Sequence, residues 1–136
     1  NGRLVFACWR RMSENPWMLK PLLATYEHVP KPPPADPNEP GPFALADKDR
    51  TTKILTGAGF ANLRFTPVDL SLEIGGAGGL DAAVRQSMTI GATSRVLQDQ
   101  PDAVRAKVAA SIREALAPYL KGQSVALPGA LWIVVT

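Results

Sequence analysis

Several aromatic and polar residues near the start of the chain have the chemistry of a small-molecule binding site. Trp9 and Arg10 end a short apolar run, Leu4–Trp9, and Asn15 and Trp17 follow a few residues later. The run predicts a strand, and in open α/β sheets ligands gather where strands end at their carboxyl side. Large aromatic residues are also ordinary core residues. For both tryptophans, a packing role and a binding role therefore stay open.

Catalytic and metal-binding residues cannot be assigned from their spacing. Cys8 is the single cysteine and lies inside the apolar run, which predicts a buried, inert thiol. His28 is the single histidine and has no second ligand at metal-binding spacing, so we expect no metal site. The carboxylates fit cap, turn or solvent-facing positions, as for Asp47, Asp49 and Asp69. The catalytic residues remain unknown at this stage.

A glycine-rich segment, Gly75–Gly79, could suggest a nucleotide loop. Leu80 and Asp81 follow it, where a phosphate-binding loop would continue with Lys and Ser or Thr. The dinucleotide fingerprint, with its later acidic residue, is also missing. We interpret the segment as a flexible hinge or lid connection.

Composition and charge limit the classes of protein to consider. The chain has 136 residues, 46% of them hydrophobic and 20% charged, which suits one globular domain. The net charge of +3 comes from scattered basic residues, so neither nucleic acid nor a membrane is an expected partner. No apolar run reaches the ~18 residues of a membrane span, and we expect a cytoplasmic protein. The chain opens with Asn1, Gly2 and Arg3 directly before the apolar run, as a sequence cut just before a strand would.

Three segments are expected to form strands. Leu4–Trp9 and Ala130–Val135 are continuous apolar runs, which predict strands buried on both faces. Between them, residues 63–74 alternate between apolar and polar, but the parity changes across Thr66 and Pro67. The change predicts a β-bulge, and the proline predicts an edge strand.

The remaining segments predict helices and a connector. Ser13 or Asn15 can cap a helix that starts at Pro16, and Asp47 can cap a second one. Two further helices are expected between residues 80 and 118, within a helical insertion over residues 75–121. Residues 29–44 contain seven prolines and predict an extended connector that ends in the apolar Phe43 and Leu45.

The order of these motifs resembles the carboxy-terminal half of class I S-adenosylmethionine-dependent methyltransferases, in the small-molecule branch. Gly2–Arg10 resembles the family's fifth strand, and Asn15–Trp17 resembles the segment after it. Ala46 through Phe60 is similar to the next helix and the "AGF" entry into strand six. Ala130–Val135 resembles the antiparallel seventh strand.

The resemblance implies an α/β fold over residues 1–136: a Rossmann-like part-sheet of strands five, six and seven, mixed, in the order 5-7-6, with about four helices. It implies that the chain is the substrate side of an enzyme that methylates a small or medium-sized acceptor. The family's donor-binding elements do not occur in this sequence, so the parent would use S-adenosylmethionine while this chain binds no cofactor and is inactive alone. The residues expected to line the substrate site are Trp9, Arg10, Asn15, Trp17, Met18 and Phe43.

An alternative is a noncatalytic dimerisation or interaction module derived from that fold. Without a fourth strand beside it, the Leu4–Trp9 strand would expose an apolar edge, and such edges pair with other chains. We therefore expect self-association through this edge or by swapping of elements.

Overall fold

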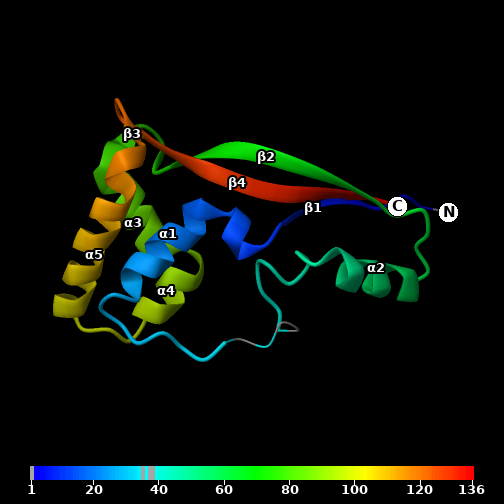
Figure 1. The fold of residues 1–136 in the computed structure, drawn as a ribbon, viewed down its shortest axis with the longest axis horizontal. Coiled ribbons are helices and arrows are strands. Elements are labelled where there is room, and N and C mark those ends of the chain that lie inside the picture. Colours follow the sequence, from blue (N-terminus) through cyan, green and yellow to red (C-terminus); the bar gives the residue numbers. More distant parts are fainter. Residues whose placement is uncertain (1, 35, 37–38) are drawn as a thin grey trace.

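A computed structural model describes residues 2–34, 36 and 39–136. The described part is α/β, and its elements are arranged as shown in Figure 1. The strands are β1 (Val5–Trp9), β2 (Arg64–Ile74), β3 (Leu120–Lys121) and β4 (Ser124–Val135). The α-helices are α1 (Pro16–Thr25), α2 (Lys48–Gly57), α3 (Gly79–Thr89), α4 (Gly91–Leu97) and α5 (Asp102–Leu116). Short 3-10 helices are η1 (Met12–Glu14), η2 (Gly76–Gly78) and η3 (Ala117–Tyr119).

The three long strands form one sheet in the order β1-β4-β2. β4 is antiparallel to both neighbours, so β1 and β2 run in the same direction. The two-residue β3 pairs with the start of β4. β4 is thus central, and the proline-containing β2 lies at an edge, where the missing amide of Pro67 breaks no ladder.

Two sequence predictions about the sheet are wrong. The sheet was expected to be mixed and three-stranded, but every pair of neighbouring strands in the described chain is antiparallel, because β4 separates the two strands that run together. The structure also has the fourth strand, β3. A run of two residues is too short to produce a periodic signal in the sequence.

The predicted bulge at Thr66 and Pro67 is wrong as well. β2 pairs with β4 without interruption from Arg64 opposite Val135 to Ile74 opposite Val125. Directly opposed residues of an antiparallel pair point to the same side of the sheet. The change of parity is therefore a change of face: the apolar residues at the start of β2 point to the side opposite those further along it.

Helices contact the two ends of the sheet through opposite faces. At one end, Ile74, Val125 and Leu127 belong to the main core, together with residues of α3 and α5. At the other end, the segment before α2 and the first residue of α2 contact the face that carries Phe65 and Trp132. Because the strands twist along their length, α2 and the helices of the main core nevertheless lie on the same side of the sheet in the view of Figure 1.

The prediction that the first and last strands are buried on both faces is wrong for this chain. Along β1 exposed and half-buried residues alternate, and Val5 is 61% exposed. In the last part of β4, Ala130 and Val134 are buried, whereas Leu131, Trp132 and Ile133 are only half-buried. In the described chain no second helical layer covers the outer face of these residues.

The helices between β2 and β4 form the main core with α1. Their fully buried side chains include Leu97 of α4 and Val108, Ile112 and Leu116 of α5. The first of the two helices expected between residues 80 and 118 is divided into α3 and α4, because Gly91 has a positive φ of 62°. The preceding glycine segment is an ordered turn: Gly79 N donates to Gln123 O at 2.9 Å.

α2 follows the sequence prediction closely. The carboxylate of Asp47 accepts a hydrogen bond from the backbone N–H of Arg50, as an N-cap residue does. Part of the predicted connector (residues 35, 37 and 38) lies outside the described residues. Its described part has no helix or strand and ends in two tight turns, Ala44 N to Gly41 O and Ala46 N to Phe43 O.

Candidate functional site

Three adjoining hollows form a groove between η1 and residues 39–47, just beyond the end of β1. The α4 hollow, about 310 Å³, is lined by Met12, Met18, Phe43, Ala92 and Arg95 together with connector residues. The middle hollow, about 410 Å³, shares Met12 and Phe43 with it. The α2 hollow, about 520 Å³, is lined by Arg11, Ser13, Glu14, Ala46, Asp47, Lys48, Asp49 and Trp132. We call the three together the η1 groove.

Asn15 holds the inner wall of the groove in place and is fully buried. Its Nδ2 donates to the carbonyl oxygens of Arg10, Arg11 and Ala130 at 3.2, 3.0 and 3.1 Å. Its Oδ1 accepts from Ala130 N at 2.9 Å and from Trp17 Nε1 at 3.0 Å. Since both ends of the amide are engaged, Asn15 makes no side-chain cap bond to α1. Its predicted place in the lining of the substrate site is not observed, because its amide joins β1, α1 and β4 inside the protein.

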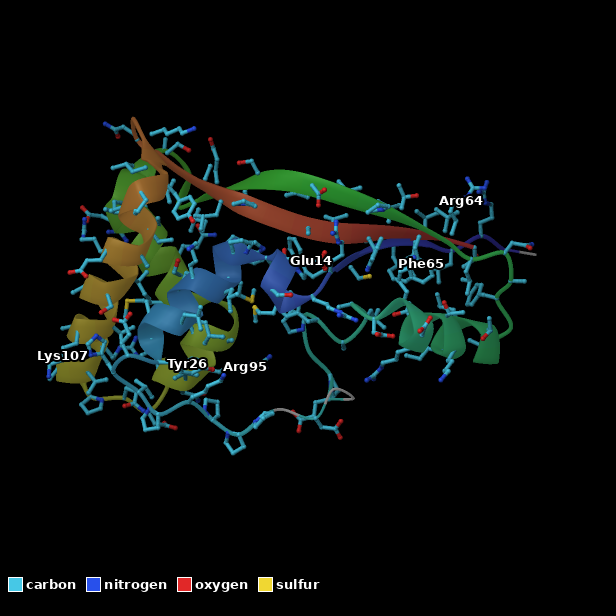
Figure 2. The ribbon with its side chains drawn as sticks, in the orientation of Figure 1. Glu14, Tyr26, Arg64, Phe65, Arg95 and Lys107 are labelled. Atoms are coloured by element: carbon cyan, nitrogen blue, oxygen red, sulfur yellow. The ribbon has the colours of Figure 1, made fainter. Side chains whose placement is uncertain are left out.

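Arg10 is also engaged within the protein. Its guanidinium pairs with Glu14, donates to Asp69 Oδ1 at 2.7 Å and lies 5.2 Å from the centre of the Trp132 ring. The hydrogen bond between them lowers the pKa of Glu14 and raises the pKa of Arg10. Arg10 therefore ties η1 to the sheet, while Glu14 lines the α2 hollow beside it (Figure 2).

The wall at α2 is built on the Trp132 ring. Trp132 Nε1 donates to Ala46 O at 3.1 Å, and Lys48 Nζ lies 5.1 Å from the ring centre. Phe65 meets the same ring edge to face at 6.2 Å, and Figure 2 shows Phe65 between β2 and α2. The backbone N–H of Arg50 lowers the pKa of Asp47. This end of the groove thus carries charges of both signs beside an aromatic ring.

The two tryptophans of the predicted site form a pair, with ring centres 5.1 Å apart and planes tilted by 49°. Trp17 supports the main core and donates to Asn15. Trp9 lines a separate hollow of about 290 Å³ with Cys8 and Pro42. Trp17 thus has a packing role in this chain, and Trp9 borders a hollow beside the free edge of β1.

Met18 and Phe43 are the predicted site residues that line the η1 groove, because both line the α4 hollow. Met12, Ala92 and Arg95 line the same hollow and were missed by the sequence analysis. Ala92 and Arg95 are three residues apart on α4 and so share one face of that helix. The sequence could therefore have placed Ala92 and Arg95 on one face of a helix. It could not have shown that this face borders the same hollow as η1.

The described residues offer little for bond-making chemistry. They contain no group of three His, Cys, Asp or Glu side chains that could hold a metal ion. His28 Nε2 is 2.7 Å from Ser111 Oγ, far along the chain from the groove residues. Burial raises the pKa of the Cys8 thiol, which disfavours the nucleophilic thiolate.

Comparison with known proteins leaves the family open: no family model matches the chain, and no curated protein matches it. Among the described residues, no helix has the length and apolar character needed to cross a membrane.

Proposed function

We propose that this chain is the substrate-side portion of a class I S-adenosylmethionine-dependent methyltransferase that acts on a small or medium-sized acceptor. The main support for this proposal is the strand order of the sheet, β1-β4-β2. β4 lies in the middle and is antiparallel to both neighbours, so β1 and β2 run in the same direction. In the family that the sequence resembles, strands five, seven and six have this arrangement. β1, β4 and β2 would then correspond to strands five, seven and six.

The free edge of β1 supports the same proposal. Arg10 N donates to Ala130 O, and Thr136 N donates to Leu4 O. Because bonded positions alternate along an antiparallel strand, the amides of Val5, Ala7 and Trp9 point away from β4. No described residue pairs with that edge. It is where the fourth strand of a donor-binding portion would lie.

The location of the groove fits an acceptor site. It lies beyond the carboxyl end of β1, where ligands bind in open α/β sheets. Methyl transfer needs the accepting atom to be held in line with the sulfonium methyl group, and positioning alone can supply much of the rate enhancement. The residues of the groove would hold the acceptor. No general base is required of this chain.

S-adenosylmethionine would supply the methyl group, but the described residues do not fit a donor site. The only glycine-rich segment, residues 75–79, forms a turn bound to Gln123 and Gln86. The carboxylates of Asp47 and Asp69 are engaged within the protein and do not offer a site for the donor's ribose: Asp47 caps α2, and Asp69 pairs with Arg10. Donor binding is therefore assigned to a portion outside this sequence.

Calorimetric titration with S-adenosylhomocysteine tests the proposal. The purified chain should not bind it, whereas the protein that includes the coding sequence upstream of Asn1 should bind one equivalent. A strand followed by Gly-x-Gly-x-Gly in that upstream sequence would agree with this result. Stoichiometric binding by the chain alone, or none by the longer protein, would overturn the proposal.

A second candidate is a noncatalytic dimerisation module, favoured by the exposed apolar edge of β1, where Val5 is 61% exposed. This candidate predicts a stable dimer in light scattering at micromolar concentration. It also predicts that the upstream sequence lacks the donor-binding glycines. A monodisperse monomer would exclude it.

A further inference from the structure

The α4 hollow has the dimensions of a site for a single small molecule. Its volume of about 310 Å³ falls at the lower end of the range for small-molecule pockets. It draws its walls from η1, α1, α4 and the turn after the connector, so residues far apart in the sequence meet around one space. The walls of this hollow indicate what it binds, and only the identification of that molecule as the methyl acceptor rests on the proposed function.

The inner walls of the hollow are apolar and rich in sulfur. Met12 and Met18 contribute thioethers, Phe43 an aromatic ring and Ala92 a methyl group. Thioethers make favourable contacts with aromatic rings and adapt their shape to them. Met18 is closely packed. It is 8% exposed, and its methyl carbon lies so near Gly91 that a Cβ built on that glycine would be only 3.0 Å away. These walls suit a flat aromatic body.

One cation borders these walls without a partner in the described chain. Arg95 is exposed on α4 (Figure 2), and its guanidinium forms no ion pair with the described residues. The arginines that hold the structure together are engaged: Arg10 with Glu14 and Asp69, and Arg105 with Leu97 O at 2.8 Å. Arg95 is therefore available to a ligand, with its planar, bidentate donors.

Acidic residues line another part of the hollow. Asp36 and Glu39 line the hollow from the connector, whereas Arg95 lines it from α4. An anionic group in the hollow is therefore attracted toward α4 and repelled from the connector. A cationic group would be oriented the other way. The charge distribution thus defines the direction in which a charged ligand lies.

We propose that the α4 hollow binds an aromatic carboxylate, with its ring between Met18 and Phe43 and its carboxylate paired with Arg95. The ring would replace water on the thioether and phenyl surfaces. The two carboxylate oxygens would accept two parallel hydrogen bonds from the guanidinium of Arg95. The methyl acceptor of the parent enzyme then belongs to the aromatic acids.

The test compares three probes with the same ring: 2-naphthoate, 2-naphthamide and 2-naphthylmethylamine. Each is titrated into the ¹⁵N-labelled chain, and binding is followed through the amide signals of Ala92, Arg95 and Phe43. We expect 2-naphthoate to bind at least about fivefold more tightly than the other two. A preference for the amine, or signal changes confined to other parts of the chain, would overturn the proposal.

Two variants and one control separate charge from shape. Arg95→Gln should weaken 2-naphthoate about five- to tenfold and leave 2-naphthamide unchanged. Ala92→Phe should weaken both probes, because it fills the hollow. Arg64→Gln makes the same change of charge at the far end of the sheet (Figure 2) and should leave all three affinities within about twofold. An Arg95→Gln protein that binds 2-naphthoate as tightly as the unchanged chain contradicts the assignment.

This experiment needs neither the methyl donor nor turnover. If 2-naphthoate fails to bind as described while the longer protein binds S-adenosylhomocysteine, the ligand class is wrong and the proposed function stands. If the probe binds but the longer protein takes up no S-adenosylhomocysteine, the hollow is an aromatic-acid site in a protein of another function.

Discussion

The side-chain amide of Asn15 hydrogen-bonds both backbone groups of Ala130: Nδ2 donates to the carbonyl oxygen at 3.1 Å, and Oδ1 accepts from the amide at 2.9 Å. Asn15 thus takes the place of a strand residue beside β4, just past the last residue of β1. The same amide holds the chain reversal at Arg10 and Arg11. This one side chain fixes where β1 ends and where the η1 groove begins.

Replacement of Asn15 should be strongly destabilising. Asn15→Ala leaves the buried N–H of Ala130 and the indole N–H of Trp17 without their acceptor, so we expect a loss of about 3 kcal/mol in the free energy of unfolding. Asn15→Asp should cost at least as much, because its carboxylate would face three carbonyl oxygens. Urea denaturation measures both. The exposed Ser13→Ala should stay within about 0.5 kcal/mol, and a loss below about 1 kcal/mol in Asn15→Ala would contradict this role.

Two buried hydroxyl groups should respond in opposite directions. Ser87 is 5% exposed, and its Oγ has no hydrogen-bond partner among the described residues. Thr25 is fully buried, and its Oγ1 donates to Pro21 O at 2.8 Å. We expect Ser87→Ala to raise the unfolding free energy by up to about 1 kcal/mol and Thr25→Val to lower it by about 1 kcal/mol. Equal shifts of the thermal midpoint in both variants would contradict the difference in bonding.

Replacement of Gly91 by alanine should lower the free energy of unfolding, whereas the same replacement of Gly57 should not. Gly91 has a φ of 62° and would press a Cβ against Met18, so Gly91→Ala should cost about 1–2 kcal/mol. Gly57 ends α2, and no atom lies within 4 Å of the position its Cβ would take. Gly57→Ala should therefore be neutral or stabilise by up to about 1 kcal/mol. Chemical denaturation of the two variants measures both changes in the free energy of unfolding. A Gly91→Ala protein more stable than the unchanged chain would contradict the expected strain at the start of α4.

The pair formed by Arg10 and Glu14 should make stability depend on pH. Because the native pKa of Glu14 is lowered from its ordinary value of 4.5, its contribution is present above pH 4.5 and is lost as the pH falls below that value. The pair is partly exposed, so we expect Glu14→Gln to cost about 0.5–1 kcal/mol at pH 7 and less below pH 4. Glu114→Gln serves as the control. Parallel pH profiles of the Glu14→Gln and unchanged proteins would show that the pair contributes nothing.

The sequence predicted those parts of the fold that depend on local chemistry. Asp47 caps α2, Pro16 opens α1, and Asp102 opens α5, because cap and first-turn preferences act within a few residues. Pro67 predicted that β2 lies at an edge, because proline has no N–H to donate to a neighbouring strand, and the proline-free apolar run Ala130–Val135 of β4 suited the central position. The bulge was mispredicted because a parity change has two causes, an extra residue or a change of buried face, and only the helices on each side tell them apart.

The site was less predictable, for a physical reason. Asn15 was expected to line the substrate site because its position after β1 was recognised, but its partner Ala130 is 115 residues away. Arg10 was also expected to line that site, and its pairing with Asp69 could not be foreseen because Asp69 lies on β2. Arg95 was missed because only the packing of α4 beside η1 brings it to the groove. In each case a contact between distant segments decides the role of the side chain.

Hydrogen exchange at the outer edge of β1 tests the central claim most directly. In the dilute monomeric chain, the amides of Val5, Ala7 and Trp9 should exchange rapidly, while those of Phe6 and Cys8, which face β4, should be protected. In the protein that includes the upstream sequence, all five should be protected, since a neighbouring strand would cover the edge. Protection of all five in the dilute chain, or continued rapid exchange of Val5, Ala7 and Trp9 in the longer protein, would contradict the account.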